Sequence, residues 1–349
     1  MDYILEDLSE RNRSILLAAI HSYAATAEPV GSRTISKRYD LGLSPATIRN
    51  AMSDLEEMGF LDQPHTSAGR GPTDYAYRTY VNSLLDIPPL PREESDLIDR
   101  SLKENLSELD HVMEAASRIL STVSRQTGMV FLPKLSHLVF KRVDFIKLRS
   151  TRALAILITE SGLVHNKIIE MEENISQEKL ENISRYLNEE FGGLPLYEIR
   201  QKIYEMMLKE KEEYDQLMRE AMALSEQAFA EEELQGEIYV GSTLNILEQP
   251  EFSNNIEKMK AIFKAFEEKS NLIRILDQCI EEEGLSILIG SENQVEEMQD
   301  CSIVTQTYTY GDRAIGTLGI LGPRRMEYPR IISIVDYIAK AVSRILTGE

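Results

Sequence analysis

Tryptophan is absent from the 349-residue chain, and cysteine occurs only twice, at Cys279 and Cys301, with no CxxC pair. A disulfide framework is therefore excluded, and the two thiols suit a reducing compartment. Long apolar runs are missing as well: residues 14–27 and 153–159 are among the most apolar stretches, and both are too short to cross a bilayer. The acidic N-terminus lacks the basic and then apolar order of a signal peptide. We expect a soluble, cytoplasmic protein without a membrane partner.

The side-chain patterns of common catalytic and metal sites are missing too. The 5 histidines have no metal-ligand spacing such as HExxH, and neither GxxxxGK[ST] nor GxGxxG occurs. The glycines of residues 316–322 lie in an apolar run that predicts a strand, and this run lacks the following helix of a dinucleotide site. No Ser/His/Asp constellation stands out. We therefore expect no catalytic residues, no metal and no cofactor.

The chain does contain enough apolar sequence for a folded core, with 42% hydrophobic and 28% charged residues. Its length predicts two or three domains, at roughly 150 residues each. The net charge of −20 argues against a generally basic nucleic-acid coat. The charge is uneven, because residues 1–85 hold 8 basic and 11 acidic side chains and the rest of the chain holds 30 and 47. An acidic body repels phosphate, which would confine any nucleic-acid contact to the N-terminal part.

Residues 1–85 have the element order of a winged helix-turn-helix domain. Ser9 can cap a first helix, Ser32 a second, short one, and Ser44 a third with proline at its first position. The third helix carries apolar residues at i, i+4 and i+7 and ends at a glycine. A short strand and a loop rich in proline and glycine follow at residues 60–72. Three short helices and then a hairpin predict the winged helix-turn-helix fold.

Residues 86–127 predict a linker and one long helix. The Pro-rich stretch 87–91 marks a domain boundary. From about residue 93 an apolar stripe alternates heptad-like spacings. The stripe consists of Leu102, Leu106, Leu109, Met113, Ala116, Leu120 and Val123. A stripe of this kind suits either the core of its own domain or a dimer seam, and the pattern leaves both open.

The rest of the chain alternates predicted strands and helices, which indicates one antiparallel sheet with flanking helices in an α+β domain. Strands are expected at residues 138–148, 153–159, 164–171, 237–240, 285–290, 302–310 and 314–321. Helices are expected at residues 176–191, 199–233, 255–268, 272–282 and 328–346. Because long helices interrupt the series of strands, we assign residues 128–174 and 281–349 to the α+β domain and residues 175–280 to an insertion.

The third helix of a winged helix-turn-helix enters the major groove, where residues near its N-terminus meet base edges. Arginine can bind guanine O6 and N7 together, asparagine can pair with adenine, and the threonine methyl can contact thymine. The preceding helix offers cations for the DNA backbone, and the wing offers an arginine between two glycines. The candidate DNA-binding residues are Ser32, Arg33, Lys37, Arg38, Ser44, Thr47, Arg49, Asn50, Ser53, His65 and Arg70. A winged three-helix unit can also be a protein–protein module, and Asn50 and Ser53 can be ordinary solvated positions.

A longer pattern points to one family. Residues 28–81, EPVGSRTISKRYDLGLSPATIRNAMSDLEEMGFLDQPHTSAGRGPTDYAYRTYV, closely resemble the heat-inducible transcription repressor family, HrcA. The resemblance is strongest in PVGS, in SPATIRN-M-DLE--G and in the wing SAGR-PT---YR-YV. It departs at Gly71, where an apolar residue is more usual, and at Ala76, where glycine is common. Residues 311–342, GDRAIGTLGILGPRRMEYPRIISIVDYIAKAV, resemble the closing strands and helix of the family.

The resemblance implies a homodimeric repressor whose N-terminal winged helix-turn-helix domain is followed by a GAF-like α+β domain with an inserted helical dimerisation segment. It implies binding of double-stranded DNA at an inverted-repeat operator, the CIRCE element, upstream of chaperone operons. It also implies that the GroEL chaperonin supports repressor activity and that heat stress relieves repression. The alternative is a small-molecule-sensing winged-helix regulator, because GAF-like domains often bind ligands.

Overall fold

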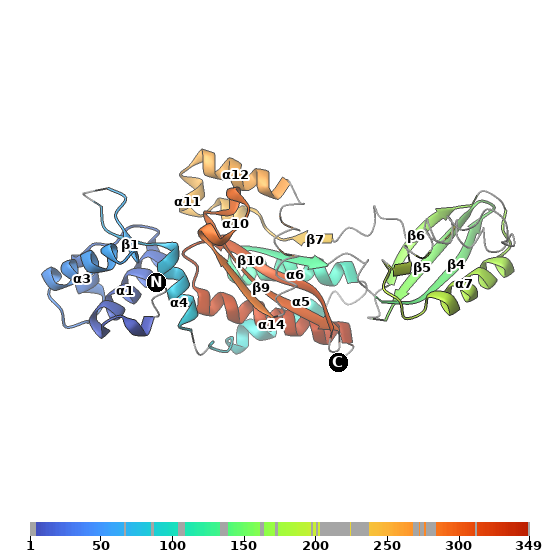
Figure 1. Ribbon diagram of the computed structural model, residues 1–349, viewed down its shortest axis with the longest axis horizontal. Coiled ribbons are helices and arrows are strands. Elements are labelled where there is room, and N and C mark those ends of the chain that lie inside the picture. Colours follow the sequence, from blue (N-terminus) through green and yellow to red (C-terminus); the bar gives the residue numbers. More distant parts are fainter. Residues whose placement is uncertain are drawn as a thin grey trace. The chain divides into compact units, whose positions relative to one another are not determined.

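The chain folds into two compact units in the computed structural model (Figure 1). The main unit comprises residues 1–130, 238–308 and 317–342, and the inserted unit comprises residues 131–237, 309–316 and 343–349. The structure describes residues 5–65, 68–84, 87–103, 109–132, 139–160, 164–171, 174–196, 198–199, 202, 224, 237–267, 272, 276, 284–310 and 313–347.

The main unit begins with the predicted winged-helix element order. Its elements are η1 (Leu5–Asp7), α1 (Glu10–Thr26), α2 (Ser32–Arg38), α3 (Pro45–Glu57), β1 (Leu61–Asp62), β2 (Gly71–Pro72) and α4 (Asp74–Asn82). Ser9 and Ser44 cap α1 and α3 as predicted, because their hydroxyls accept the backbone N–H groups of Asn12 and Thr47. These caps satisfy backbone donors that a helix cannot pair internally.

The start of α2 differs from the prediction. Gly31 is the N-cap residue, so Ser32 lies inside the helix instead of capping it. The carbonyl oxygen of Gly31 accepts the N–H of Ile35 at 3.1 Å, which begins the helical pattern one residue earlier than expected. The side chain of Ile35 is buried, as predicted, and anchors this short helix in the core.

The rest of the main unit is built on a 5-stranded sheet with the strand order β7-β3-β10-β9-β8. The strands are β3 (Thr127–Leu132), β7 (Glu237–Val240), β8 (Leu285–Ile289), β9 (Cys301–Tyr310) and β10 (Arg313–Pro323). Four of them match expected strands, whereas β3 was not predicted. β8 and β9 are antiparallel, with Leu285 opposite Gln306 and Ile289 opposite Ser302. β3 pairs with β7 and β10, which lie more than a hundred residues later in the chain.

Helices cover this sheet. α14 (Tyr328–Thr347) runs beside β9 and β10 (Figure 1), and the hydroxyl oxygens of its Tyr328 and of Ser302 in β9 lie 2.8 Å apart. The remaining short elements of the main unit are α10 (Leu244–Leu247), α11 (Pro250–Ser253), α12 (Ile256–Glu267), η4 (Gly290–Glu292) and η5 (Glu296–Met298). Cys301, the first residue of β9, is fully buried. Burial raises the pKa of its thiol well above the usual range, so the thiol stays protonated.

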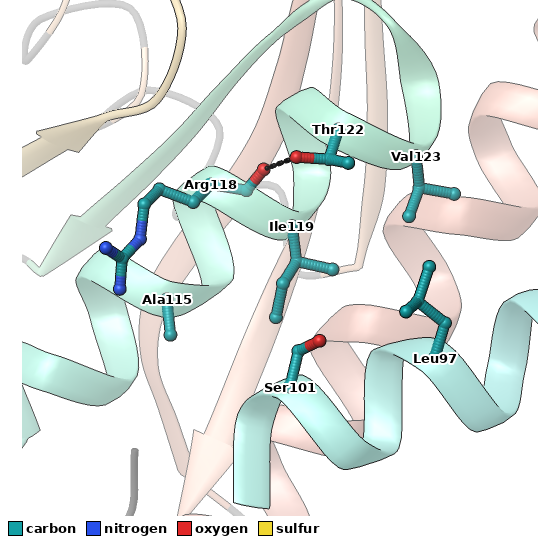
Figure 2. A pocket seen from close by; sticks show the side chains of 7 residues that line it. All are labelled: Leu97, Ser101, Ala115, Arg118, Ile119, Thr122 and Val123. Atoms are coloured by element: carbon teal, nitrogen blue, oxygen red, sulfur yellow. Dashed lines mark hydrogen bonds between the residues drawn. The ribbon is translucent and has the colours of Figure 1, made fainter. Parts of the chain in front are cut away.

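Two helices, α5 (Arg92–Lys103) and α6 (Leu109–Ser124), replace the single long helix expected after the Pro-rich stretch. They lie side by side (Figure 2), with Leu97 and Ser101 of α5 facing Ile119 of α6. One continuous helix could not bring these side chains together, so the prediction of one helix is wrong. The physical reason is that apolar stripe residues of both helices are buried. The described buried stripe residues are Leu102, Met113, Ala116, Leu120 and Val123. The stripe therefore belongs to the core of the main unit.

The inserted unit contains a separate 3-stranded antiparallel sheet, β4-β5-β6. The strands are β4 (Phe140–Arg149), β5 (Arg152–Thr159) and β6 (Val164–Glu170), and the helix α7 (Gln177–Phe191) covers one face of the sheet (Figure 1). The side chain of Asn188 in α7 accepts the N–H of Val143 at 2.7 Å and donates to the carbonyl of the same residue at 3.1 Å. These bonds satisfy backbone groups on the outer edge of β4.

The sheets differ from the expected domain boundaries, which gave residues 128–174 and 281–349 to one domain and residues 175–280 to the insertion. β4, β5 and β6 pair with one another instead of joining the 5-stranded sheet, so the inserted unit begins near residue 131 and ends near residue 237. The reason is local: short turns join these strands, and neighbouring strands pair more readily than distant ones. Most of the helices expected at 199–233 and 272–282 lies outside the described residues.

Ser121 joins α6 to the strand layer. Its hydroxyl oxygen accepts the N–H of Gly128 at 2.8 Å and the N–H of Ser242 at 3.1 Å. A Cβ added at Gly128 or Gly241 would overlap the backbone of α6 at Ser117, so both glycines permit this close approach. A single hydroxyl therefore satisfies two backbone donors where a helix and two strand ends meet.

We expect Ser121→Ala to lower the free energy of unfolding by about 2–4 kcal/mol, because it leaves two N–H groups without an acceptor. Thr122→Ala is the matched control: the Thr122 side chain is exposed, and among the described residues its hydroxyl bonds to the Arg118 carbonyl of its own helix alone, at 2.9 Å. The control should cost about 0.5 kcal/mol or less. Chemical denaturation measures both, and equal losses in the two variants would contradict the assigned role of Ser121.

Candidate nucleic-acid interface

The helix α3 is held by one apolar face and presents a polar one. Its Ile48, Met52 and Leu55 are at most 1% exposed, which fixes the rotation of the helix about its own axis. On the other side Arg49 and Asn50 are exposed. The helix therefore displays the guanidinium and carboxamide groups that base reading in a major groove requires.

Ser44, Thr47 and Ser53 are the other predicted DNA contacts of α3 and its cap. Ser44 and Thr47 form the helix start itself: the Ser44 hydroxyl accepts the Thr47 N–H at 3.1 Å, and their hydroxyl oxygens are 2.9 Å apart. Ser53 is half-buried, one turn further along the helix than Arg49. The amides of the first turn point out of the capped end, where the helix dipole favours a phosphate.

The helix α2 supplies the positive charge of the interface. Arg33, Lys37 and Arg38 are exposed, and within the described part of the chain none of them forms a salt bridge. The same holds for Arg49 of α3. Ser32 lies at the first turn of α2 and is half-buried. The structure thus brings the predicted cations of α2 and α3 into one small domain, where none of them has a salt-bridge partner among the described residues.

The wing is closed by its backbone. Val30 and Arg70 exchange two N–H···O bonds of 2.9 Å, which extends the hairpin of β1 and β2 by a third short segment. At Gly69 an added Cβ would come within 2.5 Å of the Val30 carbonyl carbon, so this position requires glycine. Gln63 closes the loop from the other side by donating to the Ala68 carbonyl at 2.7 Å. His65 is exposed at the tip of this loop.

Arg70 is already paired. Its Nε donates to Glu56 of α3 at 2.8 Å and its Nη2 lies 2.7 Å from the same carboxylate, while its side chain is 17% exposed. The pair ties the wing to the end of the recognition helix and neutralises the charge of Arg70. Sequence reasoning missed Glu56, which lies 14 residues away, although the acidic Glu56–Glu57 pair at the end of α3 was visible.

One carboxyl group at the base of the wing has a shifted pKa. Burial raises the pKa of Asp62 above its usual value, and the nearby Arg324 opposes that shift. Asp62 stands opposite Gly71 in the hairpin, where the side chain of Tyr23 also packs closely. This end of the wing is therefore anchored in the protein, whereas His65 is exposed.

Other kinds of site receive little support from the residues described. No three His, Cys, Asp or Glu side chains of the described ranges come together as a metal site. A pocket of about 240 Å³ lies between α5 and α6 (Figure 2), lined by Leu97, Ser101, Ala115, Arg118, Ile119, Thr122 and Val123. Among the helices that the structure describes, none has the length and apolar character to cross a membrane.

The fold and the exposed helix α3 define the class of protein: this is a winged-helix DNA-binding regulator. The N-terminal residues 7–84 match the profile of the winged helix-turn-helix transcription repressor, HrcA DNA-binding, and residues 110–332 match the HrcA protein C terminal domain.

Curated relatives extend this similarity over the whole chain. A heat-inducible transcription repressor HrcA of Geobacter sulfurreducens is 47% identical over 99% of this chain and 100% of its own. One of Syntrophobacter fumaroxidans is 41% identical over 98% of each chain. The chain therefore belongs to the heat-inducible transcription repressor family HrcA and is a DNA-binding transcription repressor, not an enzyme. A solved structure titled as a hypothetical protein shares its fold, with a TM-score of 0.63 and 22% identity over 98% of this chain and 99% of that one.

Lys37 is exposed and Arg70 is paired with Glu56, and this difference predicts how each affects the salt dependence of DNA binding. A free cation that contacts a phosphate releases a counterion, whereas a cation already paired inside the protein releases few. Lys37→Ala should therefore reduce the slope of log K against log salt on duplex DNA by about 0.9. Arg70→Ala should weaken binding by loosening the wing while changing this slope by much less. Titrations at several salt concentrations separate the two variants, and a full-unit change in Arg70→Ala would show that Arg70 leaves Glu56 for a phosphate.

Proposed function

We propose that this repressor binds as a homodimer to an inverted-repeat operator, the CIRCE element, upstream of chaperone operons. The observation that carries the proposal is the polar face of α3, with Arg49 and Asn50 exposed beside the unpaired cations of α2. Two such helices related by a two-fold axis read the two halves of a palindrome, so the symmetry of the operator mirrors that of the protein.

The DNA contacts divide by chemistry. Arg49 and Asn50 read bases, with Thr47 and Ser53 beside them, because their side chains lie on or next to the polar face of α3. The phosphate contacts come from the first turn of α3 at Ser44 and from α2 and the wing. The residues of α2 and the wing in this second group are Ser32, Arg33, Lys37, Arg38 and His65, whereas Arg70 acts by holding the wing through its pair with Glu56.

The inserted unit offers a surface for the second copy. On the face of its sheet opposite α7, Ile146 pairs with Leu154 and Leu154 pairs with Ile168, which makes an apolar row across three strands. Ile146 is 44% exposed and Ile168 is 57% exposed, which is unusual for a row of this kind. Val164, opposite Ile158 and four residues before Ile168 on β6, lies on the same face and is also exposed. An isologous interface uses the same patch twice, and we expect this apolar row to pack on its own copy.

Base reading by Arg49 and Asn50 predicts a sequence-dependent loss. Arg49→Ala or Asn50→Ala should each cost about 1–3 kcal/mol on the operator and little on random duplex DNA. Fluorescence anisotropy with both duplexes measures the difference. Arg185→Ala is the control, because it removes the same charge from an exposed arginine of α7, on the side of the inserted unit away from the apolar row. Equal losses on operator and random DNA would remove Arg49 or Asn50 from the base-reading residues.

The apolar row predicts a charge-sensitive dimer. Ile146→Glu places a carboxylate in the contact and should raise the dimer dissociation constant roughly tenfold or more, as sedimentation equilibrium would show. Asn182→Glu, on the exposed side of α7, adds the same charge away from this face and should leave the dimer intact. A dimer of unchanged stability in Ile146→Glu would place the dimer contact elsewhere in the chain.

We also propose that the GroEL chaperonin supports the active repressor, so that unfolded proteins which occupy the chaperonin during heat stress release repression. Titration of the protein on the inverted repeat and on a scrambled duplex, with and without chaperonin, tests this link. Palindrome-specific binding should strengthen when chaperonin is present. Specific binding that is indifferent to chaperonin would overturn this part and direct attention to a small-molecule effector, for which the pocket between α5 and α6 is the place to look.

A further inference from the structure

Inside the main unit, the helix α4 of the winged-helix domain is held by polar bonds to the 5-stranded sheet and its loops. The carboxylate of Asp74 accepts the backbone N–H of Ser291 at 2.9 Å and the Nη1–H of Arg324 at 2.8 Å. The backbone at Gly290 approaches so closely that an added Cβ would overlap the Asp74 carboxylate. The first turn of α4 is thus fitted against the loop that follows β8.

Arg78 repeats this attachment one turn later on the same face of α4, since residues four apart on a helix are neighbours. Its Nε donates to Oε1 of Glu292 at 2.7 Å, and its Nη2 donates to the other oxygen of that carboxylate and to the Ile287 carbonyl at 2.6 Å. Glu292 is itself positioned, because it accepts the N–H of Ile289 at 2.8 Å. A bidentate pair of this kind fixes direction as well as distance.

Arg325 makes a second attachment, to α1. Its Nη1 donates to the Ala24 carbonyl in the last turn of α1 at 2.9 Å. Its other nitrogens bind the Glu251 carboxylate and the side-chain oxygen of Gln249 at 2.8 Å. A cation is favoured at a helix C-terminus, where carbonyl groups lack partners. Two helices of the winged-helix domain are therefore held at separate points, which restricts rotation as well as translation.

The contact of α4 with the sheet side also buries a tyrosine whose hydroxyl makes no hydrogen bond to the described residues. Tyr77, between the two ion-paired residues of α4, is 1% exposed, and its ring centre is 6.0 Å from that of Tyr328. The Tyr77 hydroxyl is buried without a hydrogen-bond partner among the described residues. Undocking would return this hydroxyl to water, which offsets part of the cost of exposing the ring. The ion-paired side chains of Arg78 and Glu292 are 29% and 33% exposed, so their attraction is weaker than that of a fully buried pair.

We propose that this dock, formed by Asp74, Arg78, Glu292, Arg324 and Arg325, sets the orientation of the recognition helix and thereby selects the spacing of operator half-sites that the dimer accepts. The inference rests on the proposed binding of a palindrome by a dimer. The five residues are positioning residues, because they lie on α4 or the sheet side and not among the proposed DNA contacts.

The physical argument concerns the linker. If the winged-helix domain were attached only through residues 85–91, it could turn freely, and two tethered domains would bind half-sites over a range of spacings. A docked domain instead holds its recognition helix in one orientation relative to the 5-stranded sheet, which narrows the range of distances and rotations that the helix can take about the two-fold axis. Half-sites read from one face of DNA lie about 10 base pairs apart, so a change of about 5 base pairs turns a half-site to the opposite face. A docked dimer should reject that change, whereas an undocked one should tolerate it.

The test compares the full-length protein with the double variant Asp74→Asn, Arg78→Ala on operators whose spacer is altered by about 5 or 10 base pairs. The unmodified protein should lose roughly tenfold or more in affinity at the 5-base-pair change, and the variant less than about threefold. Affinity for an isolated half-site should stay the same in both. Arg118→Ala is the control, because it removes an exposed arginine of α6 that pairs with Glu114 in its own helix.

Hydrogen exchange supplies a readout that does not depend on DNA. In the double variant the amides of α4 and of residues 285–292 should lose protection, while those of α7 in the inserted unit stay unchanged. Spacing selectivity equal to that of the unmodified protein would overturn the inference, whether or not protection falls. If the unmodified protein itself shows no preference for the palindrome over a scrambled duplex, the proposed function fails and this inference fails with it.

Discussion

The apolar face of α3 is the constraint on which the rest of the interface depends. Ile48, Met52 and Leu55 must be buried, and burying them determines which side of the helix remains in water. A one-residue rotation would turn Arg49 toward the core and expose an apolar side chain. The Ser44 cap and the pairing of Glu56 with the wing hold the two ends of the helix. Base reading is thus possible because a few apolar contacts and one cap leave the helix a single orientation.

Features that depend on neighbouring residues could be predicted from the sequence. The cap at Ser44, the burial of α3 and the positions of β7 and α14 follow from spacing over a few residues, and the structure agrees with them. The cap of α2 was misplaced because Gly31 and Ser32 both suit the position, and only the hydrogen bond from Ile35 distinguishes them. The candidate DNA contacts could be chosen by residue type and exposure, which is also local information.

Features that depend on distant partners could not be predicted. Both β4 and β10 were expected as strands of one sheet, yet one belongs to the inserted sheet and the other to the main sheet, because the apolar pattern of a strand does not name its partner strand. The expected helix continued to residue 127, whereas α6 ends at Ser124, because Arg125 with φ 57° ends the helix before β3. The pair of Glu56 with Arg70 joins a helix to a loop, a contact that neither segment reveals by itself.

A repressor of this kind must satisfy two opposed requirements. Specific reading of DNA demands a rigid recognition helix, and here the rigidity comes from apolar burial within the winged-helix domain. Release demands that some contact be weak enough to break under stress, and the contacts between α4 and the sheet side include ion pairs that are partly exposed. Apolar burial changes little when the ionic surroundings change, whereas partly exposed ion pairs weaken with salt and with displacement of either partner. Apolar burial therefore keeps the winged-helix domain rigid, while the ion pairs at α4 can break. The orientation of the domain can then change while α3 itself stays folded.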